Sequence, residues 1–223
     1  MQKELETNIK SLELKIAKVS KTVSKNLDDI FLIAVSKKKS IEHIKTAQDS
    51  GINNFGENYA QELEDKANNI GRNISWHFIG PLQSNKANIV AKYADWIHTI
   101  DRKKIAYKMN EECKKINKII NACIQVNISN EPTKSGINPE KLLVFAKYVD
   151  SMENINLKGI MVLPSLGENN KKQMHDSKLL HKELISVFPH AEYLSMGTTN
   201  DFETAIISGS NMIRVGELIF GKR

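Results

Sequence analysis

The sequence predicts an α/β protein, a single-domain (β/α)8 TIM barrel with an extra N-terminal helix. Three observations support this fold. Short β-branched or apolar runs alternate strictly with segments of helical periodicity, the runs number eight, and several helical segments carry start or stop signals. Such strands run parallel and are joined by right-handed crossovers, and eight units of this kind close into a barrel. A doubly wound open sheet is the rival fold, and the lack of a GxGxxG motif after the first expected strand counts against it.

The expected strands are short. Each is a run of β-branched or apolar residues bounded by turn residues or by a helical segment. They span residues 30–36, 53–55, 75–79, 96–98, 120–127, 156–161, 193–195 and 212–215.

The expected helices fill the segments between these strands. Ser40 precedes one helical segment as a capping residue, Pro139 stands at a first helical position, and Gly51 and Gly209 lie just past helix ends. The helices span residues 41–50, 58–69, 84–93, 102–116, 139–151, 170–188 and 200–208.

The two ends of the chain complete the expected domain, residues 1–223. Only GELIFGKR follows the eighth strand, and this segment is too short for a helix that covers the strand well. The N-terminal helix, within residues 1–25, is then free to pack over that gap or across the bottom of the barrel, which occupies residues 30–223.

Composition and charge restrict the class of protein. Hydrophobic residues make up 40% of the 223 positions and charged residues 26%, which suits a packed core rather than a disordered chain. The net charge of +6 comes mostly from lysines spread over the expected helices, without an arginine-rich block or an aromatic RNA-binding motif. We therefore expect no dedicated nucleic-acid binding.

Cysteine usage and the N-terminal segment predict a cytoplasmic protein. Cys113 and Cys123 lack CxxC spacing, so we expect reduced structural thiols and no metal site. The N-terminal segment contains acidic residues, unlike a signal or transit peptide, and no apolar run is long enough to span a bilayer. We expect no membrane partner.

The stretch FLIAVSKKKS places three consecutive lysines after the first strand. Side chains alternate along a strand, so Lys37 shares one side with Ile33 and Val35. If that side faces the barrel interior, Lys37 stands at the barrel mouth, where barrel enzymes keep their chemistry, and the next two lysines fall into the loop. The alternative is that all three lysines are solvated.

Two glycine-containing loops after the last two strands predict a phosphate site. GTTND follows the seventh strand, and RVGE ends the eighth. In this fold these loops often bind phosphate, because glycine lets the backbone approach closely and a helix N-terminus offers N–H donors. The residues concerned are Gly197, Thr198, Thr199 and Gly216, ahead of a helix expected from Asn200. The alternative is an ordinary capped turn, which Gly, Thr and Asn also favour.

Arg214 lies in the eighth strand among apolar neighbours. A buried guanidinium needs a partner, which is either a structural salt bridge or a planar ligand with an acceptor nitrogen. A lysine at the barrel mouth, a phosphate site across from it and an arginine between them describe a site for pyridoxal 5′-phosphate (PLP), whose aldehyde forms a Schiff base with an amine. We therefore expect PLP as the cofactor and Lys37 as its attachment point.

Further polar clusters follow the second, third and fifth strands, in FGENYAQE, HFIGPLQSNK and NISNEPTKSG. Asn58 or Ser84 can simply cap a helix, and a residue such as His77 is more often a satisfied, semi-buried histidine than a catalytic one. Their common position at one rim of the barrel is the informative feature.

Several motifs also match a known family. They are AVSK (34–37), FGENY (55–59), WHFIGPLQSNK (76–86), HTID (98–101), NIS (127–129), KSG (134–136), SMG (195–197), RVG (214–216) and IFG (219–221). Through them the chain resembles the pyridoxal phosphate homeostasis protein family, of the YggS/PROSC type, from about Phe31 to the C-terminus. The WHFIGPLQSNK stretch is the most specific of these motifs.

The resemblance implies a barrel like the N-terminal domain of alanine racemase, with PLP held as a Schiff base on Lys37. It implies a carrier and regulator that keeps free PLP low and affects amino- and keto-acid pools. It places Arg214 at the pyridine nitrogen, with Ser195, Gly197, Thr199 and Gly216 around the phosphate. The predicted cofactor-binding residues are Lys37, Asn58, Ser195, Gly197, Thr199, Arg214, Gly216 and Glu217, and no catalytic residue is expected.

The chain departs from the family pattern in two places. The family usually has serine or threonine where this chain has Glu217, and a carboxylate there repels a phosphate unless it points away. We expect backbone donors to carry the binding and the cofactor to be held somewhat more weakly. GTTND replaces the common GMSDD, and Thr199 preserves the hydroxyl.

The main alternative function is a PLP-dependent amino-acid racemase. A racemase needs an acid/base on each face of the α-carbon, and Lys37 can serve only one. In the racemases that the chain resembles, the second base comes from another subunit's extra domain, whereas here the eight units use the whole chain. An arginine at the ring nitrogen also weakens the electron sink. We therefore expect a PLP carrier without turnover.

The resemblance implies a monomer, and no long exposed apolar stripe in the sequence demands a dimer. PLP-dependent apo-enzymes are the partners expected of a carrier. A third class, an RNA-binding or scaffold protein that uses the basic surface, would need neither Lys37 nor the phosphate loops.

Overall fold

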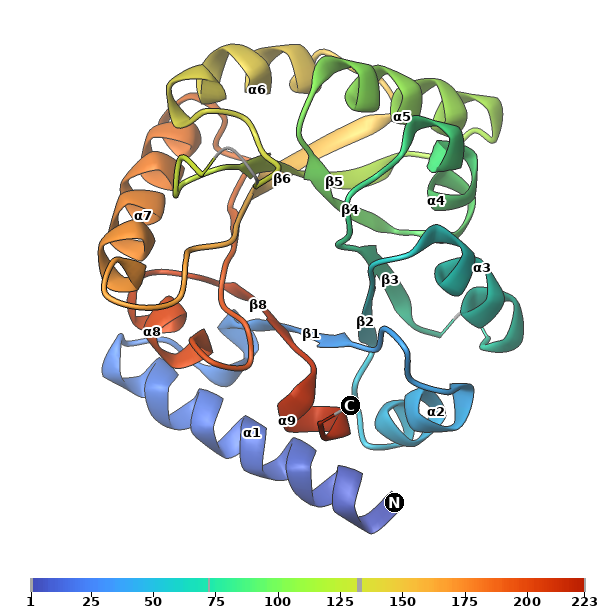
Figure 1. Ribbon diagram of the computed structural model, residues 1–223, viewed down its shortest axis with the longest axis vertical. Coiled ribbons are helices and arrows are strands. Elements are labelled where there is room, and N and C mark those ends of the chain that lie inside the picture. Colours follow the sequence, from blue (N-terminus) through green and yellow to red (C-terminus); the bar gives the residue numbers. More distant parts are fainter. Residues whose placement is uncertain (1, 72, 132–133, 223) are drawn as a thin grey trace.

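The strands form a closed barrel (Figure 1). They pair in parallel and in chain order from β1 to β8, and β8 pairs in turn with β1. The computed structural model describes residues 2–71, 73–131 and 134–222, so the predicted limits 1 and 223 lie outside the described residues. The strands are β1 (Phe31–Val35), β2 (Asn54–Glu57), β3 (Ser75–Phe78), β4 (Trp96–Ile100), β5 (Ile120–Val126), β6 (Ile155–Val162), β7 (Tyr193–Ser195) and β8 (Met212–Val215). The expected (β/α)8 barrel is confirmed, and the open sheet is wrong.

Helices cover the outer side of the barrel (Figure 1). Two of the expected helices begin with a short 3₁₀ turn, at η2 (Ser84–Lys86) and η3 (Pro139–Lys141). The α-helices are α1 (Gln2–Thr22), α2 (Ile41–Asp49), α3 (Ala60–Asn69), α4 (Ala87–Tyr93), α5 (Lys103–Lys115), α6 (Leu142–Asp150), α7 (Asn170–Val187), α8 (Phe202–Ile207) and α9 (Glu217–Phe220), with a further 3₁₀ turn, η1 (Leu27–Asp29), before β1.

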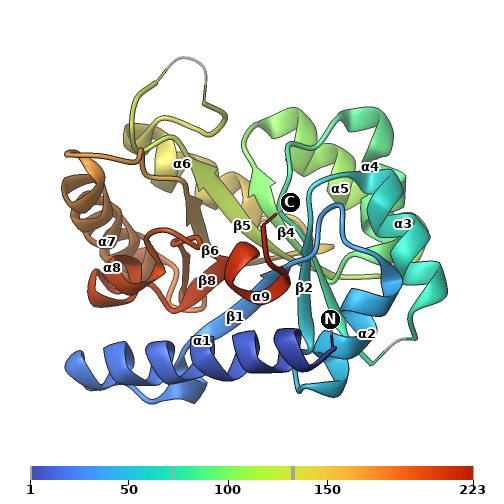
Figure 2. The same cartoon turned by 60° about the horizontal axis from the view of Figure 1, so that its bottom comes forward.

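The helix α1 lies over the seam between β8 and β1 (Figures 1 and 2). Its apolar face recurs at helical spacing and is buried against α2, α8 and the one-turn α9. The buried residues are Leu5, Ile9, Leu12, Ile16 and Val19. Of the two positions expected for this helix, the gap beside the short last helix is therefore the observed one.

Residues of β1 alternate between two hydrophobic clusters. Ile33 belongs to a small cluster inside the barrel, whereas Ala34 belongs to the large cluster between barrel and helices. The other buried members of the interior cluster come from β4, β5, β6 and β8, and they are Trp96, Cys123, Met161 and Met212. This alternation fixes which side chains of β1 point to the barrel mouth.

The strand β2 ends at Glu57, two residues later than expected, and this difference affects the surroundings of the site. The expected strand ended at Phe55, and glycine often interrupts a strand. Here the strand continues through Gly56, where an added Cβ would lie 3.0 Å from the side chains of Ile33 and Ile79. The extension places Glu57 at the strand end, fully buried, rather than in a loop.

Two further findings concern the cysteines and the length of the apolar helices. Cys113 and Cys123 are buried and form no disulfide, and burial raises the pKa of Cys113 to about 11 and the pKa of Cys123 to about 12. The expected structural thiols are thus confirmed. Among the described helices, none is both long enough and apolar enough to cross a membrane.

Candidate functional site

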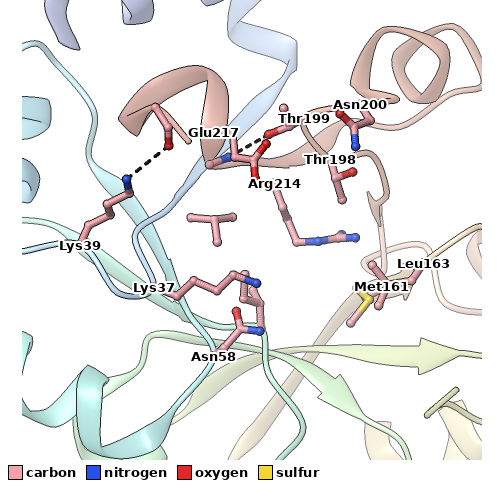
Figure 3. Close-up of a pocket in the computed structure, with 14 residues that line it drawn as sticks. Lys37, Lys39, Asn58, Met161, Leu163, Thr198, Thr199, Asn200, Arg214 and Glu217 are labelled. Carbon is pink, nitrogen blue, oxygen red and sulfur yellow. Dashed lines mark hydrogen bonds between the residues drawn. The ribbon is translucent and has the colours of Figure 1, made fainter. Parts of the chain in front are cut away.

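A pocket with a volume of about 340 Å³ opens at the carboxyl ends of the strands (Figure 3). Pockets for small molecules have volumes of about 300–1,000 Å³, and this end of a (β/α)8 barrel carries the active site in known enzymes. Its lining consists of Val35, Lys37, Lys39, Asn58, Ile79, Met161, Leu163, Thr198, Thr199, Asn200, Arg214, Gly216, Glu217 and Gly221.

Lys37 reaches into this pocket from the end of β1 (Figure 3). Ile33 lies inside the barrel and Val35 lines the pocket, so the side of the strand that Lys37 shares with them is the inner one. Ser36, on the other side of the strand, is buried toward the helices. The predicted position of Lys37 at the barrel mouth is confirmed.

The two lysines that follow have different surroundings. Lys38 is exposed and has a φ of 61°, in the left-handed region. Lys39 lines the pocket, and its Nζ donates to the carbonyl oxygens of Phe220 at 3.0 Å and Gly221 at 3.3 Å. The Lys39 amine thus caps the C-terminus of α9, and the three lysines are not equivalent.

Arg214 is buried at the inner end of the pocket, where only 4% of it is exposed. Its guanidinium donates to Ser195 Oγ at 2.6 Å and to the Val162 carbonyl oxygen at 3.1 Å. Burial lowers the pKa of Arg214 to about 10, so the group stays cationic near neutral pH. Among the described residues it forms no ion pair with a carboxylate, and the structural salt bridge considered as an alternative is wrong.

A chain of hydrogen bonds continues from Arg214 through the barrel interior. Ser195 Oγ lies 3.0 Å from His98 Nδ1, and His98 Nε2 lies 3.0 Å from His77 Nδ1. His77 Nε2 lies 3.3 Å from Asn54 Oδ1. Burial lowers the pKa of His77 to about 3 and the pKa of His98 well below its ordinary value, so both imidazoles are neutral.

The two ends of this chain determine its direction. The guanidinium of Arg214 can only donate, and the oxygen of Asn54 can only accept. A neutral imidazole donates from one nitrogen and accepts at the other, so each histidine between these ends carries its proton on Nε2. His77 is therefore a satisfied core histidine, as expected, and its neighbours orient Arg214.

The two loops predicted to bind phosphate meet at the wall of the pocket. The Thr198 N–H donates to Asp201 Oδ1 at 2.7 Å, and the Gly216 N–H donates to Thr199 Oγ1 at 3.3 Å. The helix expected from Asn200 begins two residues later, at Phe202, and the Thr198 hydroxyl also donates to Asp201 Oδ1 in the turn before it. The backbone N–H of Thr198, in the predicted phosphate loop, is thus bonded to the Asp201 carboxylate. The N–H of Gly216 is bonded to the Thr199 hydroxyl.

Two predicted site residues do not line the pocket. Ser195 is fully buried, and its hydroxyl contacts Arg214 and His98 below the pocket. Gly197 has a φ of 101°, and an added Cβ would lie 2.6 Å from the Cβ of Ala205. Gly197 therefore permits the turn between β7 and α8, and both residues support the site from outside its surface.

Asn58 and Glu217 line opposite parts of the pocket (Figure 3). Asn58 does not cap a helix, since α3 begins at Ala60 with Tyr59 as its N-cap. Its Oδ1 is buried without a hydrogen-bond partner among the described residues, which is costly in the absence of a ligand. Glu217, at the start of α9, is exposed, so water surrounds part of its carboxylate.

Several lining residues were missed by reasoning from the sequence. Asn200 belongs to a loop that was identified, but it was expected only as the start of a helix, and its contact with the pocket was not predicted. The apolar lining gives no local signal, because its members are ordinary strand-end residues. They are Ile79, Met161 and Leu163.

Comparisons with known proteins agree with this geometry. The model of the family "Alanine racemase, N-terminal domain" matches residues 8–223. The pyridoxal phosphate homeostasis protein of Haemophilus influenzae is 40% identical over 227 residues, which cover 98% of this chain and 96% of that protein.

Two solved structures are also similar. An unknown protein from Bifidobacterium adolescentis superposes with a TM-score of 0.93 at 26% identity, over 98% of this chain and 95% of that chain. PipY of Synechococcus elongatus with PLP bound superposes with a TM-score of 0.81 at 28% identity, over 92% of this chain and 100% of that chain.

Proposed function

Since the chain belongs to the alanine racemase N-terminal domain family, and within it to the pyridoxal phosphate homeostasis proteins, we propose that it binds PLP as a Schiff base on Lys37. Its role is intracellular PLP homeostasis and amino-acid and keto-acid balance, without catalytic turnover. The observation that carries the proposal is that Lys37 and Arg214, from the paired strands β1 and β8, line one pocket with Gly216. The relative PipY, whose structure has PLP bound, supports it.

The residues of the pocket suit this cofactor. PLP supplies an aldehyde, with which the Lys37 amine forms a carbon–nitrogen double bond as one water leaves. Arg214 only donates hydrogen bonds, so a pyridine nitrogen that faces it stays unprotonated. The Asn58 Oδ1 is an acceptor that a ligand donor would satisfy.

The phosphate would bind between the two loops at the pocket wall. The Gly216 N–H donates to the Thr199 hydroxyl oxygen, and both groups are donors that an anion between the loops could accept from. Ser195 accepts a hydrogen bond from Arg214, and Gly197 permits the turn between β7 and α8. Both residues therefore support PLP binding without lining the pocket. Glu217 stands beside this position as the one acidic side chain in the described lining, so we retain weakened phosphate binding as part of the proposal.

Purification and titration with PLP test the proposal. The protein should acquire an absorbance band of a protonated Schiff base, which Lys37→Ala should abolish and borohydride should fix covalently. Lys39→Ala is the matched control, because Lys39 also lines the pocket but its amine caps α9. Attachment of PLP to any residue other than Lys37 after borohydride reduction would disprove the assignment.

A PLP-dependent racemase is the alternative outcome, since the matching family model is named after alanine racemase. Incubation of the loaded protein with α-deuterated alanine distinguishes the two. A carrier leaves the deuterium in place, whereas a racemase exchanges it with solvent.

We further propose that the protein is a cytoplasmic monomer that delivers PLP to apo-enzymes and does not bind nucleic acid. Size-exclusion chromatography tests the oligomeric state. Recovery of activity by a PLP-dependent apo-enzyme mixed with the loaded protein tests delivery, and equal recovery with free PLP at the same total concentration would count against it.

A further inference from the structure

A buried cluster of charged side chains lies between the barrel and α3. Lys66 Nζ is 2.8 Å from Glu57 Oε1 and 2.7 Å from Glu62 Oε1, and it donates to the Ser36 carbonyl oxygen at 2.7 Å. The side chain of Lys66 is 6% exposed, and that of Glu57 is fully buried. We call Ser36, Glu57, Glu62 and Lys66 the outer cluster.

The outer cluster is costly for the fold. Removal of charges from water is expensive, and apolar side chains in their place are often as stable or more stable. The second oxygen of the Glu57 carboxylate, Oε2, is buried without a hydrogen-bond partner among the described residues. Stability alone therefore does not account for three ionisable groups at this place.

The contacts of the outer cluster lie on both sides of Lys37. Before it, the Ser36 hydroxyl donates to Glu57 at 2.5 Å, and the Ser36 carbonyl accepts from Lys66. After it, the Lys38 N–H donates to Glu62 Oε1. Lys38 has a positive φ, which is uncommon for residues other than glycine. The contact with Glu62 helps to stabilise this backbone conformation.

We propose that Lys66 is a positioning residue for Lys37, which it serves by fixing the backbone on both sides of that lysine through the outer cluster. The inference rests on the proposed attachment of PLP to Lys37. Lys66 lies outside the pocket lining and acts through Ser36 and Glu62. A displacement of about 1 Å at a reacting atom can slow a reaction about a hundredfold, so loosening this loop should slow the reaction of the Lys37 amine.

Two variants separate positioning from stability. Lys66→Met leaves the Glu57 carboxylate buried without its cation and should both destabilise the protein and loosen the loop. Lys66→Met/Glu57→Gln removes both charges, so stability should largely return, while the Ser36 carbonyl loses the Lys66 donor and keeps only the Lys39 N–H. Lys108→Met is the control, because Lys108 also forms an i,i+4 pair with a glutamate, Glu112, but on α5 and without a contact to Ser36 or Lys38 among those described.

The first measurement is the rate constant with which the apo-protein attaches PLP, followed by absorbance, together with the thermal midpoint of each variant. We expect attachment to be at least about tenfold slower in both Lys66 variants, including the more stable double variant, and unchanged in Lys108→Met. Recovery of the rate together with the stability in the double variant would show a structural role only and overturn the inference.

The second measurement needs no PLP. Amide hydrogen exchange of the apo-protein should become at least about tenfold faster at Lys38 and Lys39 in the double variant, and stay unchanged at Ala34 in β1. Unchanged exchange at Lys38 and Lys39 would overturn the inference. Failure of the wild-type protein to attach PLP would instead overturn the proposed function, so the two failures are distinguishable.

Discussion

Two buried polar networks border the pocket, and they differ in charge. Inside the barrel, the chain from Arg214 to His77 contains neutral groups below the guanidinium, and each of them both donates and accepts. Outside it, the outer cluster holds Lys66 between two carboxyl groups and leaves one oxygen of Glu57 unsatisfied.

The difference follows from access to water. His77, His98 and Ser195 are fully buried, and burial keeps the imidazoles neutral. The outer cluster reaches solvent through Glu62, whose side chain is 21% exposed, so it can retain charge. Burial nevertheless raises the pKa of Glu57 to about 7, against the opposing effects of Lys66 and Ser36. Arg214 is thus held by a neutral network, whereas the backbone on both sides of Lys37 contacts a network that contains a titratable carboxyl group.

The largest effect is expected from Lys66→Met at pH 8, where Glu57 is ionised in the wild-type protein. An unpaired buried charge costs about 3–5 kcal/mol in the free energy of unfolding, measured with urea. The cost should shrink at pH 5, because Glu57 can then be protonated. An equal loss at both pH values would contradict the charged state assigned to the outer cluster.

A smaller effect is expected from His98→Leu in the interior chain. The substitution leaves the Ser195 O–H without its acceptor and His77 Nδ1 without its donor, which costs about 1–3 kcal/mol for each buried group. Urea unfolding measures the loss, and His175→Leu, at an exposed position of α7, is the control. Nitrogen NMR of the wild-type protein should show Nε2–H tautomers at His77 and His98 from pH 5 to 8, and a charged imidazole in that range would refute the neutral chain.

Acidification should reveal opposite responses of the two networks. His77 has a pKa of about 3 in the folded state against an ordinary value of 6.5, so its contribution to stability is lost as the pH falls below 6.5. Glu57 has a pKa of about 7 against an ordinary 4.5, so its contribution is full below 4.5 and is lost as the pH rises toward 7. Glu57→Gln removes the contribution of Glu57, which stabilises the wild-type protein as the pH falls. The thermal midpoint of this variant should therefore fall more steeply than that of the wild type from pH 6.5 to 4.5. Parallel curves would mean that Glu57 does not titrate there.

The smallest effect is expected at Glu217, whose carboxylate is exposed rather than buried. Exposed charge interactions are worth up to about 1 kcal/mol, so Glu217→Thr should tighten PLP binding about two- to fivefold. Equilibrium titration at low salt measures the affinity, and Glu203→Thr on α8 is a control outside the described lining. An unchanged affinity would show that Glu217 does not weaken phosphate binding.

Much of the fold and part of the site could be predicted from the sequence. The alternation of strands and helices determines the barrel, because parallel strands with right-handed crossovers have few other arrangements. The period of two along β1 placed Lys37 correctly once Ile33 was assigned to the interior. These patterns are local and repeat over many residues.

The remaining features depend on contacts between distant segments. Ser195 was expected at the phosphate, but its hydroxyl contacts His98, which lies 97 positions earlier in the sequence. The outer cluster was missed because the expected strand ended at Phe55, which left Glu57 in a loop. A carboxylate after a glycine gives no signal that Lys66 will meet it in a buried layer.

The junction of β1 and β8 has a mechanical consequence. Among the described strands it is the one junction that no crossover of the chain bridges, since these strands are the first and the last of the barrel. Ile33 pairs there with Arg214, and the pocket opens directly above, with Lys37 on one side and Gly216 on the other. A ligand bonded covalently to Lys37 and hydrogen-bonded to Gly216 would link the two strands across this junction. We therefore expect ligand binding to reduce the motion of the barrel most at the junction of β1 and β8.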